Sequence, residues 1–577
     1  MRKEKEFKEF LKIRGHSMVN VLFIIPPYFN AEDYLNNDRK AVLPAFTIPY
    51  GILSLDAYLK KHCEKNINIE ILDLNILLHE LVECQFKGEY TVKFEESILN
   101  MLKTCSPKFV CFSALFNSSA QYLAALCKIT KEFNSEIITL TGGGLPSADY
   151  EKVLNTCPGL DAVCKGEGEL PLKELLDAED PWIIFDENKS WITAQGVKSG
   201  KIPEHTFLWD LDEIPFFDYS KIDLSFYNNR SLGKKDKGKD KREMSIHTSR
   251  GCPFKCVFCS NPSLHGYDVR FMSVARFISD IKRMKNDFGM TDLMLEDDHF
   301  FHDIKRAKLI LKELAKIDIR VEFPNGLAVY AIDDEVSELI SKAGVSAVAL
   351  AVESGSDYVL NKIIKKPLRK KRIQPAIESL RKFNVRTHVF IVIGLPGETD
   401  EHRRETLNTL LVNEFDWVHV NVALPIAGSR LYDICIENGY IEDQTAENYI
   451  ATKSLIRAPG IDPEKIEHFA YETQLLVNFV YNSNIKNKHY QIAIDYMKNV
   501  CEKYPQHALG HLYLSKCYKE IGESKLFQKH KILSDNLFSS DTDWKNFKDK
   551  YIDNGKGIPI DLHPKEEVDL AVEVITM

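Results

Sequence analysis

The sequence predicts an α/β protein with an N-terminal doubly wound parallel sheet, a central partial (β/α)6 barrel and a C-terminal helical segment. Short β-rich apolar runs alternate with amphipathic helical stretches over residues 18–180 and again over 244–445, which is the rhythm of parallel sheets. After about residue 446 the strand pattern ends and helical patterns remain. A chain of 577 residues with 44% hydrophobic residues is long enough for three or four hydrophobic cores.

The first α/β stretch contains five candidate strands, VNVLFII, NIEILDL, KFVCFSA, EIITLT and LDAVCK. Ligands of doubly wound sheets bind beyond the carboxyl ends of the strands. We therefore expect a binding site formed by residues that follow these strands. They are Pro26, Pro27, Tyr28, Ser113, Gly142, Gly143, Gly144 and Glu167. The three glycines also have a simpler interpretation as a strand-to-helix turn.

The second α/β stretch has six candidate strands, MSIHTS, DLMLE, RVEFP, AVALAV, THVFIVI and VHVNVA. Six units are too few for a closed eight-stranded barrel, so we expect an open barrel with its site at the carboxyl ends of the strands. Residues 1–17 are expected to be a tail, and 181–243 an irregular linker. That linker ends in a Lys/Gly/Asp run, GKKDKGKDKRE, which can bury little surface and is therefore expected to be mobile.

Residues 446–577 are expected to form a helical domain. The stretch HALGHLYLSKCYKEIGESKL resembles one tetratricopeptide unit. Arrays of such units usually need about three repeats to be stable alone, so this segment should pack on the rest of the chain, as a substrate-side cap.

Composition narrows the classes of partner. Lys and Arg total 75 against 84 Asp and Glu, so the net charge of −9 offers no basic surface for nucleic acid or an anionic membrane. No run of about 18 apolar residues is present, and the first residues mix both charges. The 13 cysteines are odd in number and mostly isolated, as expected of reduced thiols in the cytoplasm. A small molecule or a peptide is the expected substrate.

Three cysteines differ from the others because they share one loop, SRGCPFKCVFCSNP, directly after the candidate strand MSIHTS. Cys252, Cys256 and Cys259 have C-x3-C-x2-C spacing. Iron–sulfur clusters ordinarily take four protein thiolates, so three leave one iron open to chelate S-adenosylmethionine (SAM). The alternative is a zinc knuckle with His247 or His265 as the fourth ligand, but a zinc site would not need the parallel strands that follow.

This loop resembles that of the radical SAM superfamily, including the aromatic residue before the last cysteine, Phe258. The resemblance implies a [4Fe-4S] cluster held by the three cysteines and a set of SAM-binding residues at later strand ends. An acidic motif would receive the methionine amino group, ESG would meet the ribose and carboxylate, GLPG would lie along the adenine, and the last strand would lie near the cofactor. The residues so implied are Glu296, Asp297, Glu353, Ser354, Gly394, Pro396 and Val422.

Two of these segments also have simpler interpretations. Acidic residues are common near helix starts, and any strand-to-helix loop can use a G-x-P-G turn.

The first domain resembles the cobalamin-binding subfamily of radical SAM enzymes through IIPPY, IPYGILSLDAYL, TGGGLPSA and GEGELPLKELL, and the resemblance covers roughly residues 18–450. It implies a corrin between the strand ends of the first domain and the barrel mouth. The cobalt-ligand pattern D-x-H-x-x-G is absent, because the first 180 residues hold only His16, His62 and His79. Members without a histidine ligand are known in the subfamily, and the domain could also be an empty relic.

The resemblance therefore implies a cobalamin-dependent radical SAM enzyme, similar to the class B methyltransferases. It would methylate an unactivated carbon of a small molecule or peptide, with electrons from a reductant such as flavodoxin or ferredoxin. Two alternatives stay open. One is cyclisation, rearrangement or oxidation without methyl transfer on the same scaffold, and the other is a zinc-stapled interaction protein.

Overall fold

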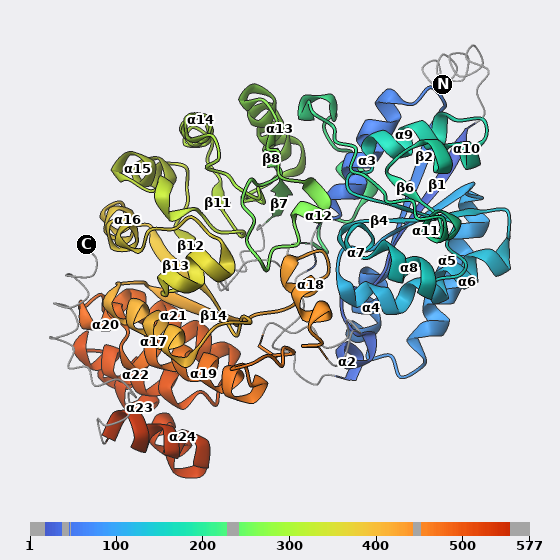
Figure 1. The fold of residues 1–577 in the computed structure, drawn as a ribbon. Coiled ribbons are helices and arrows are strands. Elements are labelled where there is room, and N and C mark those ends of the chain that lie inside the picture. Colours follow the sequence, from blue (N-terminus) through green and yellow to red (C-terminus); the bar gives the residue numbers. More distant parts are fainter. Residues whose placement is uncertain (1–17, 37–45, 47, 228–241, 442–451, 554–577) are drawn as a thin grey trace.

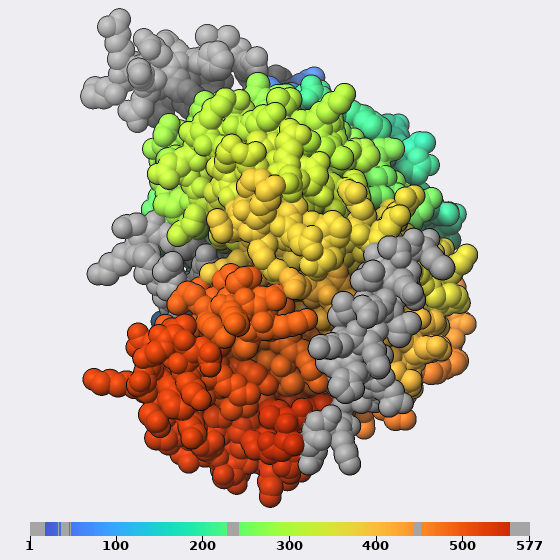
Figure 2. Space-filling model, turned by 90° about the vertical axis from the view of Figure 1, so that its left-hand side faces the viewer, coloured from blue at the N-terminus to red at the C-terminus, as the bar shows by residue number. Residues whose placement is uncertain are grey.

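The computed structural model describes residues 18–36, 46, 48–227, 242–441 and 452–553. The predicted tail and most of the Lys/Gly/Asp run lie outside these ranges. The first sheet lies at the right of the view, the two smaller sheets of the middle part lie to its left, and the C-terminal helices lie below these smaller sheets (Figure 1). In the space-filling view the C-terminal helices form a lobe below the middle part (Figure 2).

The first part is a six-stranded sheet with strand order β2-β1-β3-β4-β5-β6. Its first five strands are parallel and only β6 runs antiparallel. The five strands predicted from the sequence are all present. The strands are β1 (Val19–Ile25), β2 (Ile67–Asp73), β3 (Phe109–Ser113), β4 (Ile138–Gly142), β5 (Ala162–Cys164) and β6 (Trp191–Ile192).

Helices cover both faces of this sheet. Alternate residues of each strand point to opposite faces, and the apolar side chains on each face pack against helices. Leu22 and Ile24 of β1 pack with α4, α5 and α6, whereas Val21 and Phe23 pack with α3 and α9. Both faces are thus apolar, as a doubly wound sheet requires. The helices of this part are α2 (Ala31–Asn36), α3 (Tyr50–His62), α4 (Leu74–Glu83), α5 (Tyr90–Cys105), α6 (Ala120–Phe133), α7 (Gly144–Ala148), α8 (Tyr150–Thr156) and α9 (Glu169–Asp177).

The segment expected to be a linker differs from that expectation. Residues 181–198 form α10 (Pro181–Glu187), β6 and α11 (Ala194–Lys198), so they complete the first sheet. The following Pro-aromatic stretch buries its apolar side chains in the core of the middle part, because aromatic residues gain more from burial than from exposure. These buried residues are Leu208, Leu211, Ile214, Phe217 and Tyr219.

The middle part contains two parallel three-stranded sheets, ordered β11-β10-β7 and β12-β13-β14, and one isolated parallel bridge joins Leu327 to Leu350 between them. Each of the six predicted strands is present. The strands are β7 (Glu243–Ile246), β10 (Asp292–Leu295), β11 (Arg320–Glu322), β12 (Ala347–Glu353), β13 (Arg386–Ile393) and β14 (Trp417–Val422).

Helices follow most of these strands and cover their outer faces (Figure 1). Ser273 caps the first of them by accepting a hydrogen bond from Arg276 N, and Gly289 ends it in the left-handed conformation. The helices are α13 (Val274–Phe288), α14 (Ile304–Leu314), α15 (Asp334–Lys342), α16 (Ile373–Lys382), α17 (Asp400–Val412) and α18 (Arg430–Glu437).

The edge strand β14 is covered by side-chain amides rather than by another strand. Asn478, in the π-helical continuation Leu476–Val480 of α19 (Pro463–Leu475), accepts from Val418 N and donates to Val418 O, each at 2.8 Å. An exposed edge would offer unpaired groups to other chains. This contact therefore fixes the C-terminal part to the middle part.

The last helices cover the amino ends of the strands, not the carboxyl ends. Tyr496 stacks on Trp417, and Asp495 pairs with Arg386 at 2.6 Å. The expectation of a substrate-side cap is therefore wrong for these helices, because their apolar side chains pack at the opposite end of the sheet. They are α20 (Ser483–Lys486), α21 (Tyr490–Lys503), α22 (Ala508–Glu520), α23 (Ser524–Ser540) and α24 (Thr542–Lys548).

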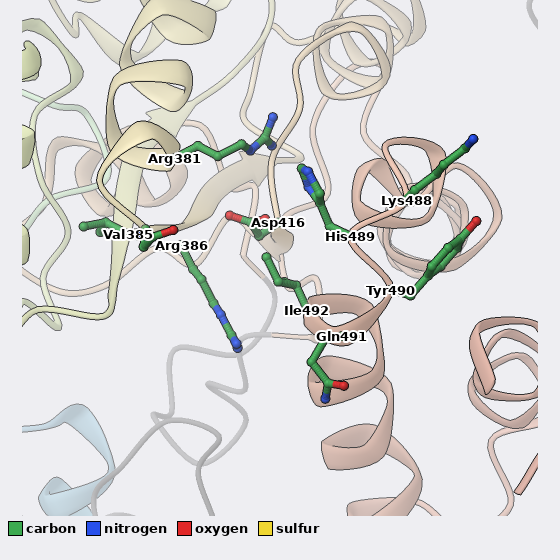
Figure 3. Close-up of a pocket in the computed structure, with 10 residues that line it drawn as sticks. Arg381, Val385, Arg386, Asp416, Lys488, His489, Tyr490, Gln491 and Ile492 are labelled. Carbon is green, nitrogen blue, oxygen red and sulfur yellow. The ribbon is translucent and has the colours of Figure 1, made fainter. Parts of the chain in front are cut away.

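A cavity of ≈ 600 Å³ lies at these amino ends, between the strands and α21. Figure 3 shows that Arg381 of α16, Asp416 just before β14 and His489 just before α21 line this cavity. Parallel barrels carry their chemistry at the other end of the strands.

Within the described residues, no helix combines the length and the apolar character needed to span a bilayer.

Candidate active site

A short antiparallel ribbon closes the base of the cysteine loop. β8 (Ser249–Arg250) pairs with β9 (Arg270–Phe271), and residues 251–269 between them include α12 (Pro262–His265). Gly251 has φ +93°, and a Cβ there would lie 2.4 Å from Asp268 O. Only glycine allows the two sides of the loop to approach so closely. The loop thus begins with a sharp turn at Gly251.

The three cysteines of the loop are free and half-buried. Burial raises the pKa of Cys252 to about 11, that of Cys256 to about 12 and that of Cys259 above its ordinary value. Cys259 raises the pKa of the other two thiols further. A bound cation would reverse this preference by stabilising the thiolates. Three soft thiolate donors that lie in each other's electrostatic field fit an iron–sulfur cluster.

The two histidines suggested as the fourth ligand of a zinc knuckle have other partners. Within the described ranges, no group of three His, Cys, Asp or Glu side chains is arranged to hold a single metal ion. His265 is also occupied, since its Nδ1 lies 2.9 Å from Glu167 Oε1, and His247 packs against the Tyr50 ring.

The acidic motif after β10 holds the base of the cysteine loop. Asp297 accepts hydrogen bonds from Thr248 Oγ1 at 2.5 Å and from Ser249 Oγ at 2.7 Å, and Asp298 accepts from Gly251 N at 2.9 Å. Burial raises the pKa of Asp297. Asp297, expected to receive the methionine amino group, instead uses both oxygens within the protein. Glu296 remains half-buried, with Ser245 Oγ donating to it at 2.9 Å.

The end of β12 brings a buried ion pair close to the cysteines. Glu353 has a positive φ of 68°, which is rare outside glycine and is found at functional sites. Its Oε1 accepts from Lys366 Nζ at 2.9 Å, and the Lys366 charge partly offsets the rise that burial causes in the pKa of Cys252 and Cys256. Lys366 was missed by sequence reasoning, because nothing in IIKKPL distinguishes it from Lys365. Ser354, by contrast, is buried against Thr406 of α17.

The GLPG segment after β13 is tightly constrained. Gly394 has φ +85°, and a Cβ there would lie 2.8 Å from Ile466 of α19. Its N–H donates to Glu398 Oε2, while Oε1 of this buried carboxyl has no hydrogen-bond partner. Burial raises the pKa of Glu398 to about 7. Pro396 lies between these two residues and is half-buried, whereas Val422 at the end of β14 is buried.

The carboxyl edge of the first sheet presents aromatic side chains. Asn75 orders the segment after β1, because its side chain accepts from Tyr28 N and donates to Pro26 O. The Tyr28 ring meets the edge of Phe116, which is 49% exposed beyond Ser113 at the end of β3. Partly exposed aromatic side chains at this edge are suited to contact an apolar face of a corrin ring.

Two of the glycines after β4 allow neighbouring loops to approach closely. A Cβ on Gly143 would lie 2.7 Å from Ala114 O, and one on Gly144 would lie 2.6 Å from Leu115 O, whereas Gly142 meets nothing closer than 3.8 Å. Gly143 and Gly144 thus fit the simpler interpretation as a turn. The two described histidines of this domain are engaged elsewhere, since His62 stacks on Tyr58 and His79 lies 3.1 Å from the Tyr34 hydroxyl.

The first domain and the cysteine loop meet through buried charges. Glu167 accepts from both terminal nitrogens of Arg270 at 2.7 Å, and its Oε2 lies 3.2 Å from Arg250 Nη1. Burial alone would raise the pKa of Glu167, but Arg250, His265 and Arg270 outweigh it and hold that pKa below its ordinary value. Glu167, expected at a corrin site, thus faces the cysteine loop.

Comparison with known proteins agrees with both halves of this site. The model of the radical SAM superfamily matches residues 246–410, and that of the B12 binding domain matches residues 38–176, together more than half of the chain. The chain is 25% identical over 460 residues to cytidylyl-2-hydroxyethylphosphonate methyltransferase of Streptomyces wedmorensis, covering 74% of this chain and 85% of that protein.

Two further proteins are similar to the chain. The hopanoid C-3 methylase of Methylococcus capsulatus is 27% identical over 343 residues, covering 59% of this chain and 63% of that protein. The structure of the radical SAM methyltransferase TsrM from Kitasatospora setae, with cobalamin and a [4Fe-4S] cluster bound, matches with a TM-score of 0.54 and 15% identity. It covers 89% of this chain and 99% of that one.

A radical SAM domain uses a [4Fe-4S] cluster and SAM, and a B12 binding domain binds cobalamin, so the two family matches confirm the cofactors predicted from the sequence. The chain is therefore an enzyme of the radical SAM superfamily and belongs to the cobalamin-binding subfamily.

Proposed function

We propose that this enzyme methylates an unactivated carbon of a small molecule or peptide. The observation that carries this proposal is the direct contact between the carboxyl edge of the first sheet and the base of the cysteine loop, through Glu167, Arg250 and Arg270. A methyl carrier in the first domain and a radical source in the second must act on one substrate, so their sites must adjoin. The relatives named as methyltransferases support the same activity.

Residues of the middle part would hold the radical-generating cofactors. We assign Cys252, Cys256 and Cys259 to the cluster, with Phe258 beside it. Glu296 would hold the SAM amino group, and Lys366 together with Glu353 would face its carboxylate and ribose. The backbone at Gly394 and Pro396 would lie along the adenine. When bound, the cluster supplies the electron that cleaves SAM, and cobalamin supplies the methyl group.

Residues of the first domain would hold the corrin. Pro26, Tyr28 and Ser113 line the carboxyl edge, and Phe116 adds an apolar surface beside them. Gly142 leaves room at the end of β4, since a Cβ there would meet only Cys164 at ordinary contact distance. The two described histidines of this domain already contact Tyr58 and Tyr34, so we propose cobalamin binding without a histidine ligand to cobalt.

The two small sheets together support an open (β/α)6 barrel over residues 244–445, with the doubly wound domain at 18–180 preceding it. The C-terminal helices would pair as in a tetratricopeptide unit, and they pack against the amino ends of the barrel strands. Radical intermediates must be kept from water. The first domain would provide this cover, because its helix α7 packs closely against the segment that follows β14. A Cβ added at Gly428 in that segment would lie 2.8 Å from both Ala148 of α7 and Ser263 of α12.

A one-electron reductant such as flavodoxin or ferredoxin would complete the reaction. All 13 cysteines are free, which supports a reducing compartment such as the cytoplasm.

The test is anaerobic reconstitution with iron, sulfide and hydroxocobalamin, followed by incubation with methyl-labelled SAM, a reductant and a small-molecule extract of the source cells. We expect retained corrin absorbance, 5′-deoxyadenosine and label in an extracted compound, all dependent on Cys256. Formation of 5′-deoxyadenosine without retained corrin or transferred label would support cyclisation, rearrangement or oxidation and would contradict methyl transfer.

A further inference from the structure

Two arginines face each other at the base of the cysteine loop. In the ribbon that closes the loop, Arg250 of β8 lies directly opposite Arg270 of β9. Like charges at directly opposite positions of a strand pair repel each other. Both side chains are buried, with only 5% and 3% of their surface exposed. The loop therefore closes only if these two buried charges are neutralised.

The neutralising charges come from the other domain. Glu167 binds both arginines, with two bonds of 2.7 Å to Arg270 and a 3.2 Å contact to Arg250. Glu169 accepts from Arg250 Nη2 at 2.8 Å and from Ser54 Oγ at 2.6 Å. Both carboxylates follow β5 and are buried, with 5% and 3% of their surface exposed. Two negative charges of the first domain thus balance two positive charges of the loop.

We infer that Glu167 is the counter-ion that lets the cysteine loop close, so that docking of the first domain is coupled to formation of the cluster site. The inference rests on the proposed function only in treating Cys252–Cys259 as the cluster loop. From the barrel side, Asp297 and Asp298 hold residues 248–251. Carboxylates from both domains therefore fix the loop base, and Glu167 acts as a positioning residue that does not touch the cluster.

This role differs from that of a corrin-binding residue. Oε1 of Glu167 accepts from Arg270 and lies within hydrogen-bond distance of His265, while Oε2 accepts from Arg270. A corrin side chain could reach these oxygens only by displacing the arginine. Arg270 is further held by Leu208 O at 3.0 Å and by the ring of Phe207, which lies 4.3 Å from its guanidinium carbon.

The test is hydrogen–deuterium exchange of segment 251–269 in the full-length protein without cofactors. Glu167→Gln keeps the size of the side chain but leaves a buried arginine unpaired, so we expect exchange in this segment to rise by about tenfold or more. In the double variant Glu167→Gln/Arg270→Gln the repulsion is gone and Arg250 keeps Glu169, so exchange should return toward the wild-type rate. Glu338→Gln, which changes an exposed carboxylate paired with Lys342 on α15, is the matched control.

Iron retained after reconstitution gives a second readout, which should fall in Glu167→Gln and recover in the double variant. If the single variant fails to fold, recovery of a folded protein in the double variant supports the inference as well. Equal exchange in Glu167→Gln and the wild type would overturn it, as would a double variant no better than the single one. Failure of the proposed function would look different, with a closed loop and normal iron but no methyl transfer.

Discussion

Lys366 Nζ lies 2.9 Å from Glu353 Oε1, and this buried ion pair stands in the electrostatic field of the cluster cysteines. Glu353 is held in a left-handed conformation at the end of β12, and Lys366 follows the left-handed residue Lys365. Two strained backbone positions thus frame one charge pair, as is typical of sites where geometry serves function.

Replacing Lys366 by Met should leave Glu353 buried without its partner. Breaking a buried pair in this way costs about 3–5 kcal/mol of stability, whereas replacing an exposed lysine costs little. We expect the free energy of unfolding, measured by urea denaturation, to fall by this order in Lys366→Met. The control Lys362→Met changes an exposed lysine of the same segment. If the two variants are equally stable, the Lys366–Glu353 pair does not stabilise the folded protein as predicted.

Glu398 should make stability depend on pH near neutrality. Burial raises its pKa to about 7 from an ordinary value of 4.5, so the folded state holds a proton that the unfolded state has released. The contribution of Glu398 to the free energy of unfolding is present in full below pH 4.5 and is lost as the pH rises through 7. A shift of this size corresponds to about 3 kcal/mol.

Denaturant titrations at pH 5.5 and pH 8 would measure this effect. Glu398→Gln, which stays neutral at every pH, should lose less stability than the wild type between the two values. The exposed residue Glu405 of α17 gives the control, Glu405→Gln, which should follow the wild type. An unchanged pH dependence in Glu398→Gln would mean that this carboxyl titrates normally.

Asn478 should be needed for attachment of the C-terminal helices. Replacement by Leu would leave both polar groups of Val418 without partners at a buried edge. Each unsatisfied group costs about 1–3 kcal/mol. We expect limited proteolysis to release the C-terminal helices faster in Asn478→Leu than in the wild type. Asn546→Ala on the exposed face of α24 should not change the rate, and equal cleavage of Asn478→Leu and the wild type would contradict this role.

The strands and the cysteine loop could be predicted from the sequence because their signals are local. Alternating apolar runs mark each of the eleven expected parallel strands, and the cysteine spacing lies within eight residues. β6 was missed because two residues carry no periodic pattern. Its segment contributes Trp191, whose burial shows only once the sheet is assembled.

The site's partners were harder to predict because they depend on tertiary contacts. Glu167 meets Arg270 across 103 positions of sequence, and Asp297 meets Thr248 across 49. A single sequence shows that these groups are charged but not which of them meet. Asp297 and Glu167 were thus expected to bind cofactors, whereas the structure uses their oxygens to hold the cysteine loop.

The most direct test of the account concerns three cysteines that hold a cluster with one open iron. Anaerobically reconstituted protein should bind about four irons, and the electron paramagnetic resonance spectrum of its reduced form should change when SAM is added. Cys252→Ala, Cys256→Ala and Cys259→Ala should each lose that signal, while Cys435→Ala, which alters a buried thiol of α18, should keep it. A colourless protein that binds zinc, or a reduced cluster whose spectrum SAM leaves unchanged, would contradict the account.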